Sequence, residues 1–318
     1  MKVCLISTTG GHLVQILMLK EVYQDLDHYF VTVKNDFSEK VMESEKSYYI
    51  TQILRDPGKL LVNALEGFRI LKKERPDVII TTGAGDVLPT CILGKIMGSK
   101  VVFLETFARV RKPSLVGRFL VPFADKVLVQ WQSMTEHYKN AIYSGPIYVA
   151  TERERLPERP RIFMATGTHT ASFHRLVEHV DAMVEKGEIE VSGAQIGHSS
   201  YEPKNFPWER FISFDRFLKS LRDSDIVLTH DGASSMGLAL SFGKHVIVVP
   251  RKKEYGEVEY ASKQDLARYL AGEGLVTMVE NVEDIGEGIS RAMNMGRVKS
   301  VEWETGPIEI IEDYLSTL

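Results

Sequence analysis

At residues 2–12 the chain reads Lys-Val-Cys-Leu-Ile-Ser-Thr-Thr-Gly-Gly-His, a strand-like run that ends in small residues, two glycines and a histidine. The same design returns at residues 161–169, which read Arg-Ile-Phe-Met-Ala-Thr-Gly-Thr-His. A strand followed by a glycine turn and a helix presents backbone N–H groups where an anionic ligand binds. The repetition predicts two units of similar design in one chain.

Short apolar runs alternate with amphipathic helical stretches on both sides of these segments. Fully apolar strands separated by helices indicate a parallel sheet that is covered on both faces. The sequence therefore predicts the α/β class with two doubly wound, Rossmann-like domains. The runs are Val3–Ile6, Tyr29–Val33, Val78–Thr81, Val101–Leu104, Val127–Val129, Ile162–Ala165, Glu190–Ile196, Ile226–Thr229 and Val246–Val249.

The alternation stops near residues 150–160, which are charged and contain two prolines. Such a composition is typical of an interdomain linker. We therefore expect one domain over residues 1–150 and a second domain that begins at residue 151.

Composition bounds the function classes. The 318 residues are 44% hydrophobic and 26% charged, as in a globular protein, and the net charge of −4 argues against a general nucleic-acid binder. Cys4 and Cys91 lie in predicted apolar segments, so buried free thiols are expected rather than a disulfide framework. No signal peptide or membrane-spanning run is evident. We expect a cytoplasmic chain whose membrane contact, if any, is peripheral.

Ligands of open parallel sheets bind beyond the carboxyl ends of the strands, and the motifs of the first half fall there. Gly10 and Gly11 allow the backbone to approach an anion such as a diphosphate. His12 would supply an imidazole that titrates near neutrality, as a general base requires. A histidine that only caps the helix is an equally good interpretation. The turn at residues 81–86, with Gly83 and Gly85, is a second diphosphate or acceptor site or an ordinary strand-to-helix turn.

Residues 103–112 end a strand with Glu105 and continue into a basic cluster. The carboxylate would orient a histidine, act as a base itself or bind an acceptor hydroxyl. Arg109 and Arg111 suit a lipid diphosphate or anionic head groups, although a solvated charge run is common. Residues 59–73 and 114–123 are apolar with basic flanks, which suits a membrane surface or helices packed on the sheet.

The second half carries a dense set of candidate donor-binding residues. Small residues at a helix start allow phosphates to lie against backbone N–H groups, and serine hydroxyls add donors. Arginine suits a diphosphate, glutamate and glutamine suit ribose or sugar hydroxyls, and the backbone of Phe214 would face a uracil ring. A satisfied polar surface is the weaker alternative. The candidates are Gly167, Thr168, His169, Phe214, His230, Gly232, Ala233, Ser234, Ser235, Arg251, Glu257 and Gln264.

At these residues the chain resembles a single-chain fusion of the two-subunit N-acetylglucosaminyltransferase that adds the second sugar to dolichyl diphosphate. It is also similar to paired bacterial exopolysaccharide transferases and, more distantly, to the peptidoglycan enzyme that makes lipid II. The acceptor-side motifs are Thr9-Gly-Gly-His12, Thr82-Gly-Ala-Gly85, Leu104-Glu-Thr-Phe-Ala-Arg109, Ser114-Leu-Val-Gly-Arg118 and Val129-Gln-Trp131. The donor-side motifs are Gly167-Thr-His169, His230-Asp-Gly-Ala233, Val249-Pro-Arg-Lys-Lys253, Tyr255-Gly-Glu257 and Gln264.

The resemblance implies a GT-B fold, in which two Rossmann-like domains face each other across a cleft. Residues 1–150 would bind the acceptor and associate with the membrane. Residues 151–306 would bind the UDP-sugar, and residues 307–318 would form a C-terminal helix that packs back on the first domain. The implied partners are the UDP-sugar, a lipid diphosphate-linked sugar and the cytoplasmic face of a membrane, without nucleic acid. A homo-oligomer is left open.

The resemblance further implies inversion at the anomeric carbon with no metal and no cofactor, because the UDP-sugar is itself the donor substrate. His12 is the expected base, with Glu105 as its partner or rival. Ser234, Ser235 and Arg251 would stabilise the departing UDP. The expected reaction moves N-acetylglucosamine onto a polyprenyl or dolichyl diphosphate-linked sugar.

Three features depart from the relatives. No anchor helix is seen at the start of this sequence, so peripheral docking would replace it. Leu238 stands where relatives often have an acidic residue, so Glu257 or Glu259 would hold the ribose instead. Lys263 stands where a histidine often precedes the glutamine, so the sequence defines the donated sugar less well than the nucleotide.

Other functions fit parts of the pattern. Glucose or glucuronate could be the donated sugar in exopolysaccharide synthesis. A non-hydrolysing UDP-sugar 2-epimerase has a similar two-domain architecture, but it has no use for basic-flanked apolar stretches. A membrane scaffold without chemistry is slightly favoured by Leu238, whereas His12, Glu105 and Arg251 argue against it.

Overall fold

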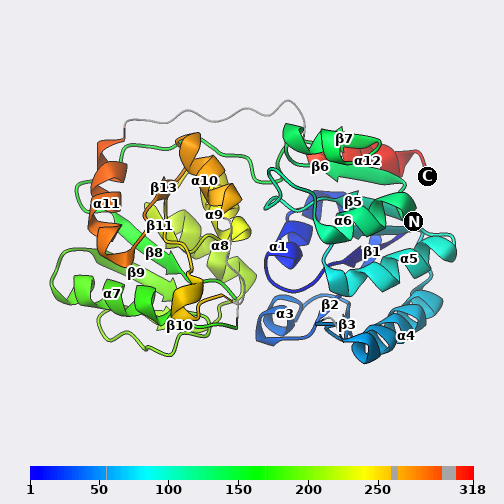
Figure 1. Ribbon diagram of the computed structural model, residues 1–318, viewed down its shortest axis with the longest axis horizontal. Helices are drawn as coiled ribbons and strands as arrows, with labels where there is room; N and C mark the ends of the chain where they lie inside the picture. The colour runs from blue at the N-terminus through cyan, green and yellow to red at the C-terminus, as the bar shows by residue number, and fades with distance from the viewer. Residues whose placement is uncertain (55, 169, 259–263, 296–305) are drawn as a thin grey trace. The chain divides into compact units, whose positions relative to one another are not determined.

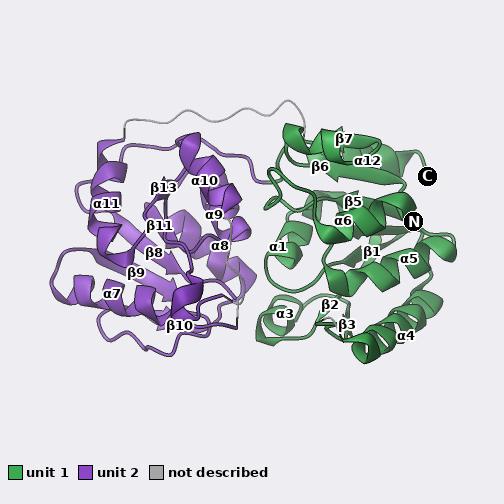
Figure 2. Ribbon diagram, viewed as in Figure 1, with its two compact units in different colours: residues 1–147, 303–318 green, residues 148–302 purple. Residues whose placement is uncertain are grey.

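The computed structural model describes the whole chain except residues 55, 169, 259–263 and 296–305. It divides into two compact units, which Figure 2 shows in green and purple. Unit 1 comprises residues 1–147 and 303–318, and unit 2 comprises residues 148–302. Within the described residues, no helix is both long and apolar enough to cross a bilayer.

Unit 1 is built on a seven-stranded, fully parallel sheet in the order β3-β2-β1-β4-β5-β6-β7. The chain adds β2 and β3 on one side of β1 and then returns to add the other strands on its opposite side. The carboxyl ends of β1 and β4 therefore form a topological switch point, where ligands of such sheets bind. The strands are β1 Lys2–Ile6, β2 Asp27–Val33, β3 Ser47–Ile50, β4 Val78–Thr81, β5 Lys100–Leu104, β6 Lys126–Val129 and β7 Ala141–Tyr143.

The helices of unit 1 cover both faces of its sheet (Figure 1). Right-handed crossovers that run in opposite directions from β1 place the helices after β1 and β2 on one face and those after β3, β4 and β5 on the other. On the second face α4 packs against α5, and α5 against α6. The helices are α1 Gly11–Leu17, α2 Lys20–Tyr23, α3 Asp36–Val41, α4 Pro57–Glu74, η1 Gly85–Val87, α5 Leu88–Ile96, α6 Leu115–Leu120, η2 Val121–Phe123, η3 Gln132–His137 and α12 Pro307–Ser316.

The C-terminal residues 307–318 belong to unit 1. Helix α12 contacts α2, and the Lys126 ammonium lies 5.0 Å from the centroid of the Tyr314 ring. The two cysteines, Cys4 and Cys91, are free and buried in the core of the same unit.

Unit 2 repeats the design with a six-stranded parallel sheet in the order β10-β9-β8-β11-β12-β13. Its switch point lies between β8 and β11. The strands are β8 Arg161–Ala165, β9 Glu190–Gln195, β10 Trp208–Glu209, β11 Ile226–Thr229, β12 His245–Val248 and β13 Thr277–Met278. The helices are α7 His174–Glu185, α8 Phe214–Asp223, α9 Ala233–Ser241, η4 Lys253–Tyr255, α10 Asp265–Gly272, η5 Val282–Asp284 and α11 Ile285–Asn294.

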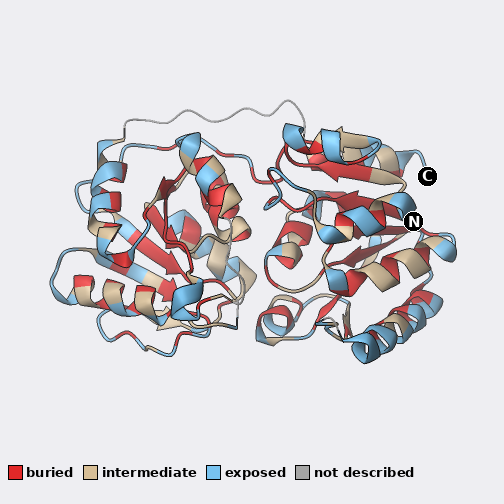
Figure 3. Ribbon diagram, viewed as in Figure 1, coloured by how far each residue is buried: buried red, intermediate tan, exposed pale blue. Residues whose placement is uncertain are grey.

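The parallel sheets confirm the predicted α/β class with two Rossmann-like units. Every predicted apolar run lies on a strand, and the strands form the buried centre of each unit in Figure 3. Four strands lacked a clear pattern in the sequence: β3, β7, β10 and β13. They lie at the sheet edges, where side chains are only partly covered, so alternation or length is lost.

Candidate functional site

His12 lies at the switch point of unit 1, in the first turn of α1. Its Nδ1 atom lies 2.9 Å from the carbonyl oxygen of Thr82, which follows β4. Because a carbonyl oxygen only accepts, Nδ1 carries the proton and Nε2 keeps a lone pair in the neutral ring. The Thr82 hydroxyl in turn donates to the His12 carbonyl at 3.1 Å. Among the described residues, no hydrogen-bond partner occupies Nε2.

The surroundings favour the neutral imidazole. Burial of the ring lowers the pKa of His12 below its usual 6.5, against the opposing effects of the Thr82 hydrogen bond and the Glu105 charge. A half-buried, neutral ring with a free Nε2 lone pair has the properties of a general base near neutral pH.

The glycine turns beside His12 have backbone conformations that other residues rarely adopt. Gly10 has φ of 73° and Gly83 has φ of 86°, both in the left-handed region. Asp86 connects the two turns, since its carboxylate accepts a hydrogen bond of 2.9 Å from the Thr8 hydroxyl. The same carboxylate accepts from the backbone N–H of Ile53, in the segment after β3, at 2.8 Å. Sequence reasoning had not singled out this aspartate as a site residue.

The contacts of Glu105 argue against its predicted role as a base, whereas its predicted role as a partner of His12 stays open, since its charge raises the pKa of that ring. Its side chain is 1% exposed and accepts from the backbone N–H groups of Thr106 at 2.9 Å and Ser114 at 3.0 Å, and from the Tyr138 hydroxyl. A carboxylate that is buried and occupied in this way does not serve as a base. It instead anchors the segment that carries the predicted basic residues.

Arg109 and Arg111 lie on that anchored segment with exposed side chains. Neither has an ion pair within the described part of the chain. The charge of Arg109 is among the influences that lower the pKa of His12, which puts the two in the same electrostatic environment. Gly11 and Gly85 are also exposed at this edge. The carboxyl ends of these strands thus combine a neutral histidine with two exposed cationic side chains.

In unit 2, His230 lies against both glycine turns of the switch point. A Cβ atom on Gly167, whose φ is 82°, would lie 2.6 Å from the Nε2 atom of His230. A Cβ on Gly232 would also collide with the same ring. The histidine therefore fills the space that these glycines leave. Thr168 is half-buried beside it, and His169 lies outside the described residues.

Helix α9 begins directly after the second of these turns, with Gly232 as its N-cap and Ala233 as its first residue. Ser234 is buried and accepts a hydrogen bond of 2.9 Å from the Tyr148 hydroxyl. Ser235 is half-buried. The turn of small residues at the start of a nine-residue helix fits the predicted phosphate contact.

The predicted contact of Arg251 with a diphosphate is not the arrangement in the structure. The residue is 4% exposed, and its guanidinium donates to the carbonyl oxygens of Thr166 at 2.7 Å, Ala171 at 2.7 Å and Glu257 at 3.1 Å. It also lies 5.2 Å from the centroid of the Phe173 ring. Arg251 therefore stabilises the glycine turn after β8 from the interior of unit 2, through hydrogen bonds to the carbonyls on either side of the turn.

The carboxylate of Glu257 likewise bonds to other residues of the protein, and not in the way that the predicted contact with a ribose requires. It is 0% exposed and forms a bidentate ion pair with Arg175 at 3.0 and 3.1 Å. It also accepts from the backbone N–H of Lys252 at 2.8 Å. The alternative ribose ligand, Glu259, lies outside the described residues.

The remaining predicted donor residues lie at helix starts. Phe214 is the half-buried first residue of α8. Gln264 is the N-cap of α10 with φ of 53°, and its side-chain oxygen accepts from Arg268 at 3.0 Å.

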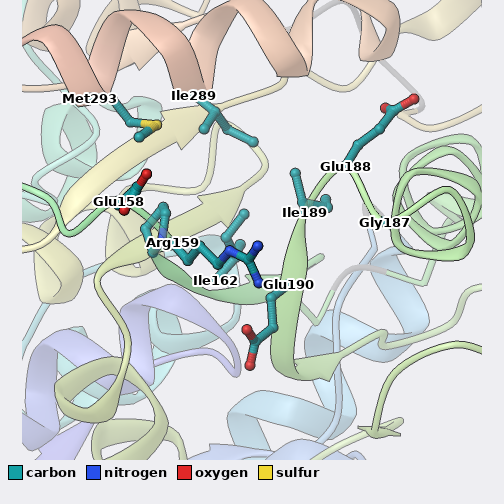
Figure 4. A pocket seen from close by; sticks show the side chains of 10 residues that line it. Glu158, Arg159, Ile162, Gly187, Glu188, Ile189, Glu190, Ile289 and Met293 are labelled. Atoms are coloured by element: carbon teal, nitrogen blue, oxygen red, sulfur yellow. The ribbon is translucent and has the colours of Figure 1, made fainter.

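The well-formed cavity in Figure 4, of about 260 Å³, lies away from these candidates. It is lined by residues that precede or begin β8 and β9, including Arg159, Ile162 and Glu190, and by Ile289 and Met293 of α11 (Ile285–Asn294), and therefore lies at the amino ends of the strands. Within the described residues, no cluster of three or more histidine, cysteine or acidic side chains has the geometry of a metal site.

Comparison with solved structures defines the fold. A MurG from Acinetobacter baumannii superposes with a TM-score of 0.63 at 14% identity, covering 100% of this chain and 99% of that one. A UDP-GlcNAc 2-epimerase from Methanocaldococcus jannaschii gives 0.66 at 13% identity, with 100% and 99% covered. The two parallel-sheet units thus form a GT-B glycosyltransferase fold, as predicted.

Family models then divide the chain between two descriptions. Residues 53–147 match "Oligosaccharide biosynthesis protein Alg14 like", and residues 161–302 match "Glycosyltransferase family 28 C-terminal domain". The chain therefore contains an Alg14-like domain followed by a family 28 C-terminal domain, which confirms the predicted resemblance. The segment with His12 precedes the first matched range.

Among curated proteins, the "UDP-N-acetylglucosamine transferase subunit alg14" of Schizosaccharomyces pombe is 45% identical over 75 residues, which are 22% of this chain and 36% of that subunit. A "UDP-N-acetylglucosamine--N-acetylmuramyl-(pentapeptide) pyrophosphoryl-undecaprenol N-acetylglucosamine transferase" of Borrelia garinii is 22% identical over 280 residues, 77% of this chain and 75% of that enzyme. The chain spans about a third of the length of the first Alg14 subunits that it matches.

The arrangement around Arg251 predicts a stability effect in the absence of any ligand. Replacing Arg251 by Met leaves three backbone carbonyls without their donor, so the free energy of unfolding should fall by about 2–4 kcal/mol. Urea denaturation without nucleotide measures this, with the exposed Lys253→Met as the matched control, which should change it by less than about 0.5 kcal/mol. If the Arg251→Met protein kept its stability and lost only its affinity for the nucleotide, the predicted direct contact of Arg251 with the diphosphate would be supported instead.

Proposed function

We propose that the protein is an inverting, metal-independent glycosyltransferase that moves N-acetylglucosamine from its UDP derivative to a lipid diphosphate-linked sugar. The observation that carries the proposal is the His12 ring, whose Nδ1–H is fixed by Thr82 and whose Nε2 remains free at the switch point of unit 1. The matches to an Alg14-like domain and to a family 28 C-terminal domain support the donor and acceptor classes.

In the proposed reaction, an acceptor hydroxyl attacks the anomeric carbon of the donor sugar. A new bond forms between this oxygen and the carbon, and the bond from the carbon to the β-phosphate oxygen of UDP breaks. The hydroxyl proton passes to Nε2 of His12, and UDP leaves with the bonding electron pair. Single displacement of this kind inverts the configuration, and positioning supplies much of the rate enhancement.

Each unit contributes one substrate site to the proposal. In unit 1 the exposed side chains of Arg109 and Arg111 would bind the acceptor diphosphate. In unit 2 the turn at Gly167 and the start of α9 at Gly232 would hold the UDP phosphates through backbone N–H groups. Arg251 would act indirectly, by fixing the carbonyls of the first of these turns.

A UDP-sugar 2-epimerase remains the second candidate because it has the same fold. The surface of unit 1 favours the transferase. Ten of its exposed large apolar side chains lie on the layer formed by α4, α5, α6 and η2, whose outward faces are exposed in Figure 3. They are Leu60, Leu61, Val62, Leu65, Phe68, Ile96, Met97, Leu115, Phe119 and Phe123.

We infer that this layer, here called the apolar layer, docks on the cytoplasmic face of a membrane. Exposed basic side chains lie on the same helices or in the segment just before α6: Lys59, Arg69, Lys72, Lys73, Arg111, Lys112 and Arg118. A surface that combines exposed apolar and basic side chains suits the boundary between acyl chains and anionic head groups. An enzyme with a lipid-linked acceptor requires such a surface, whereas an epimerase of a water-soluble nucleotide sugar does not.

The first prediction for this function concerns His12. His12→Ala should lower kcat for transfer to a short-chain lipid diphosphate–GlcNAc by about 10²–10⁴-fold, because the hydroxyl loses its base. Calorimetric affinity for UDP should stay within about twofold, since unit 2 is untouched. The control is His28→Ala, which removes another half-buried histidine whose Nδ1 donates to a backbone carbonyl, at 2.8 Å from Leu26. Wild-type turnover in His12→Ala would exclude the base assignment.

The lowered pKa of His12 gives a pH prediction. The base acts only when neutral, so kcat/KM should be level at neutral pH and fall about tenfold per pH unit below the pKa of His12. Because burial lowers that pKa, the midpoint should lie below 6.5. Initial rates between pH 5 and 8 measure it. A midpoint above 7, or the same acid limb in residual activity of His12→Ala, would contradict the prediction.

The apolar layer predicts membrane binding that depends on particular side chains. The double variant Leu61→Asp, Phe119→Asp should bind at least about tenfold more weakly to vesicles of phosphatidylcholine and phosphatidylglycerol, because two apolar anchors and their burial energy are lost. Vesicle flotation measures the partition coefficient. Val149→Asp, which alters an exposed apolar side chain of unit 2, is the control. Equal binding of the wild type and the double variant would refute docking through this layer.

A further inference from the structure

A buried amide lies one turn beyond His12 on α1. Gln15 is 1% exposed, and its Nε2 donates to the Thr106 hydroxyl at 3.1 Å and to the Gly11 carbonyl at 3.4 Å. Its Oε1 accepts from the backbone N–H of Phe107 at 2.9 Å. The side chain thus connects the helix that carries the base to the segment after β5, on which Glu105 and Arg109 also lie.

A second buried amide continues the connection. Gln130, at the end of β6, is also 1% exposed, and its Nε2 donates to Oε1 of Gln15 at 2.9 Å and to the carbonyl of Glu105 at 2.8 Å. Its Oε1 accepts from the backbone N–H of Ile147 at 2.9 Å. Because backbone N–H groups only donate, each glutamine must turn its oxygen toward one of them, so both amides have one orientation.

The network uses nearly all the hydrogen-bond donors and acceptors of the two side-chain amides. Two side-chain amides removed from water would be costly if they were unpaired, so the site tolerates few arrangements of α1 and the 105–109 segment. The indole N–H of Trp131 adds a further bond, of 2.7 Å, to the carbonyl of Phe107. The 105–109 segment is therefore held from the side of α1 and from the side of β6 at the same time.

We propose that Gln15 is a positioning residue, which fixes the His12 ring relative to the segment that presents Arg109 to the acceptor diphosphate. This inference rests on the proposed function and adds a residue that contacts neither substrate. An acceptor is held through its diphosphate and deprotonated at a hydroxyl, so the base and the cation must keep a set separation. Small errors in such a separation lower the rate of attack strongly.

The decisive variant is Gln15→Met, which keeps the length and packing of the side chain but removes all of its hydrogen bonds. We expect kcat/KM for the acceptor to fall by about 10–100-fold, in both kcat and KM, while KM for the UDP-sugar stays within about twofold. Gln15→Glu keeps the two acceptor contacts to Phe107 and Gln130 and should recover most of the loss. Thr106→Val, which removes one bond at the rim of the network, should give a smaller change in the same direction.

The matched control is Ser99→Ala. Ser99 is also buried, and its hydroxyl donates to the carbonyl of Pro76 at 2.7 Å, but it lies at the amino ends of the strands, just before β5. It should lower the melting temperature without changing either KM. A Gln15→Met protein that stays folded and keeps the wild-type kcat and acceptor KM would overturn the proposal. So would equal kinetic losses in Gln15→Met and Ser99→Ala.

A readout independent of activity separates this inference from the function it rests on. Exchange of the Phe107 backbone amide with solvent should be slow in the wild type and faster in Gln15→Met, because this N–H loses its acceptor, Oε1 of Gln15. If the wild type transferred no sugar from any donor, the proposed function would fail, and amide exchange would still test whether Gln15 holds the 105–109 segment against α1. Equally slow exchange of the Phe107 amide in Gln15→Met would then overturn the role of Gln15.

Discussion

The reciprocal pair of hydrogen bonds between His12 and Thr82 is the constraint on which the site of unit 1 depends. It joins the segment after β1 to the segment after β4, the two strands between which the chain changes direction. The ring bond selects the tautomer, and the hydroxyl bond fixes the backbone from which the ring projects. The two adjacent strands lead to helices on opposite faces of the sheet, and ligands of such sheets bind between these diverging connections, where the free nitrogen of His12 lies.

The two units use their polar residues in different ways. In unit 1 the charged groups at the strand ends, Arg109 and Arg111, are exposed, and buried amides hold the segment that carries them. In unit 2 the corresponding charged residues, Arg251 and Glu257, are buried, and their hydrogen bonds stabilise the turns from the interior of the unit. In the proposed function, backbone N–H groups would contact the ligand there, which suits a nucleotide diphosphate better than a variable acceptor.

The sequence predicted the sheets well, because buried parallel strands are apolar throughout and stand out from helices. It predicted less well what each polar residue does. The motif around Arg251 correctly pointed to a strand end, but the sequence does not show that three carbonyls lie within reach of the guanidinium. Gln15 was missed for a related reason. A glutamine in a short helix usually faces solvent, and only tertiary packing brings Thr106 and Phe107 to it.

The two helical layers that cover the unit 1 sheet differ chemically. The exposed large apolar side chains of its described helices lie on or next to α4, α5, α6 and η2, and none lies on α1, α2 or α3. If unit 1 rested on a bilayer through the former, that unit would have a single preferred orientation relative to the membrane plane. Its search for an acceptor would then take place in two dimensions, among molecules that diffuse in the same leaflet. Encounter frequency would be set by the lateral density of the lipid and not by its bulk concentration.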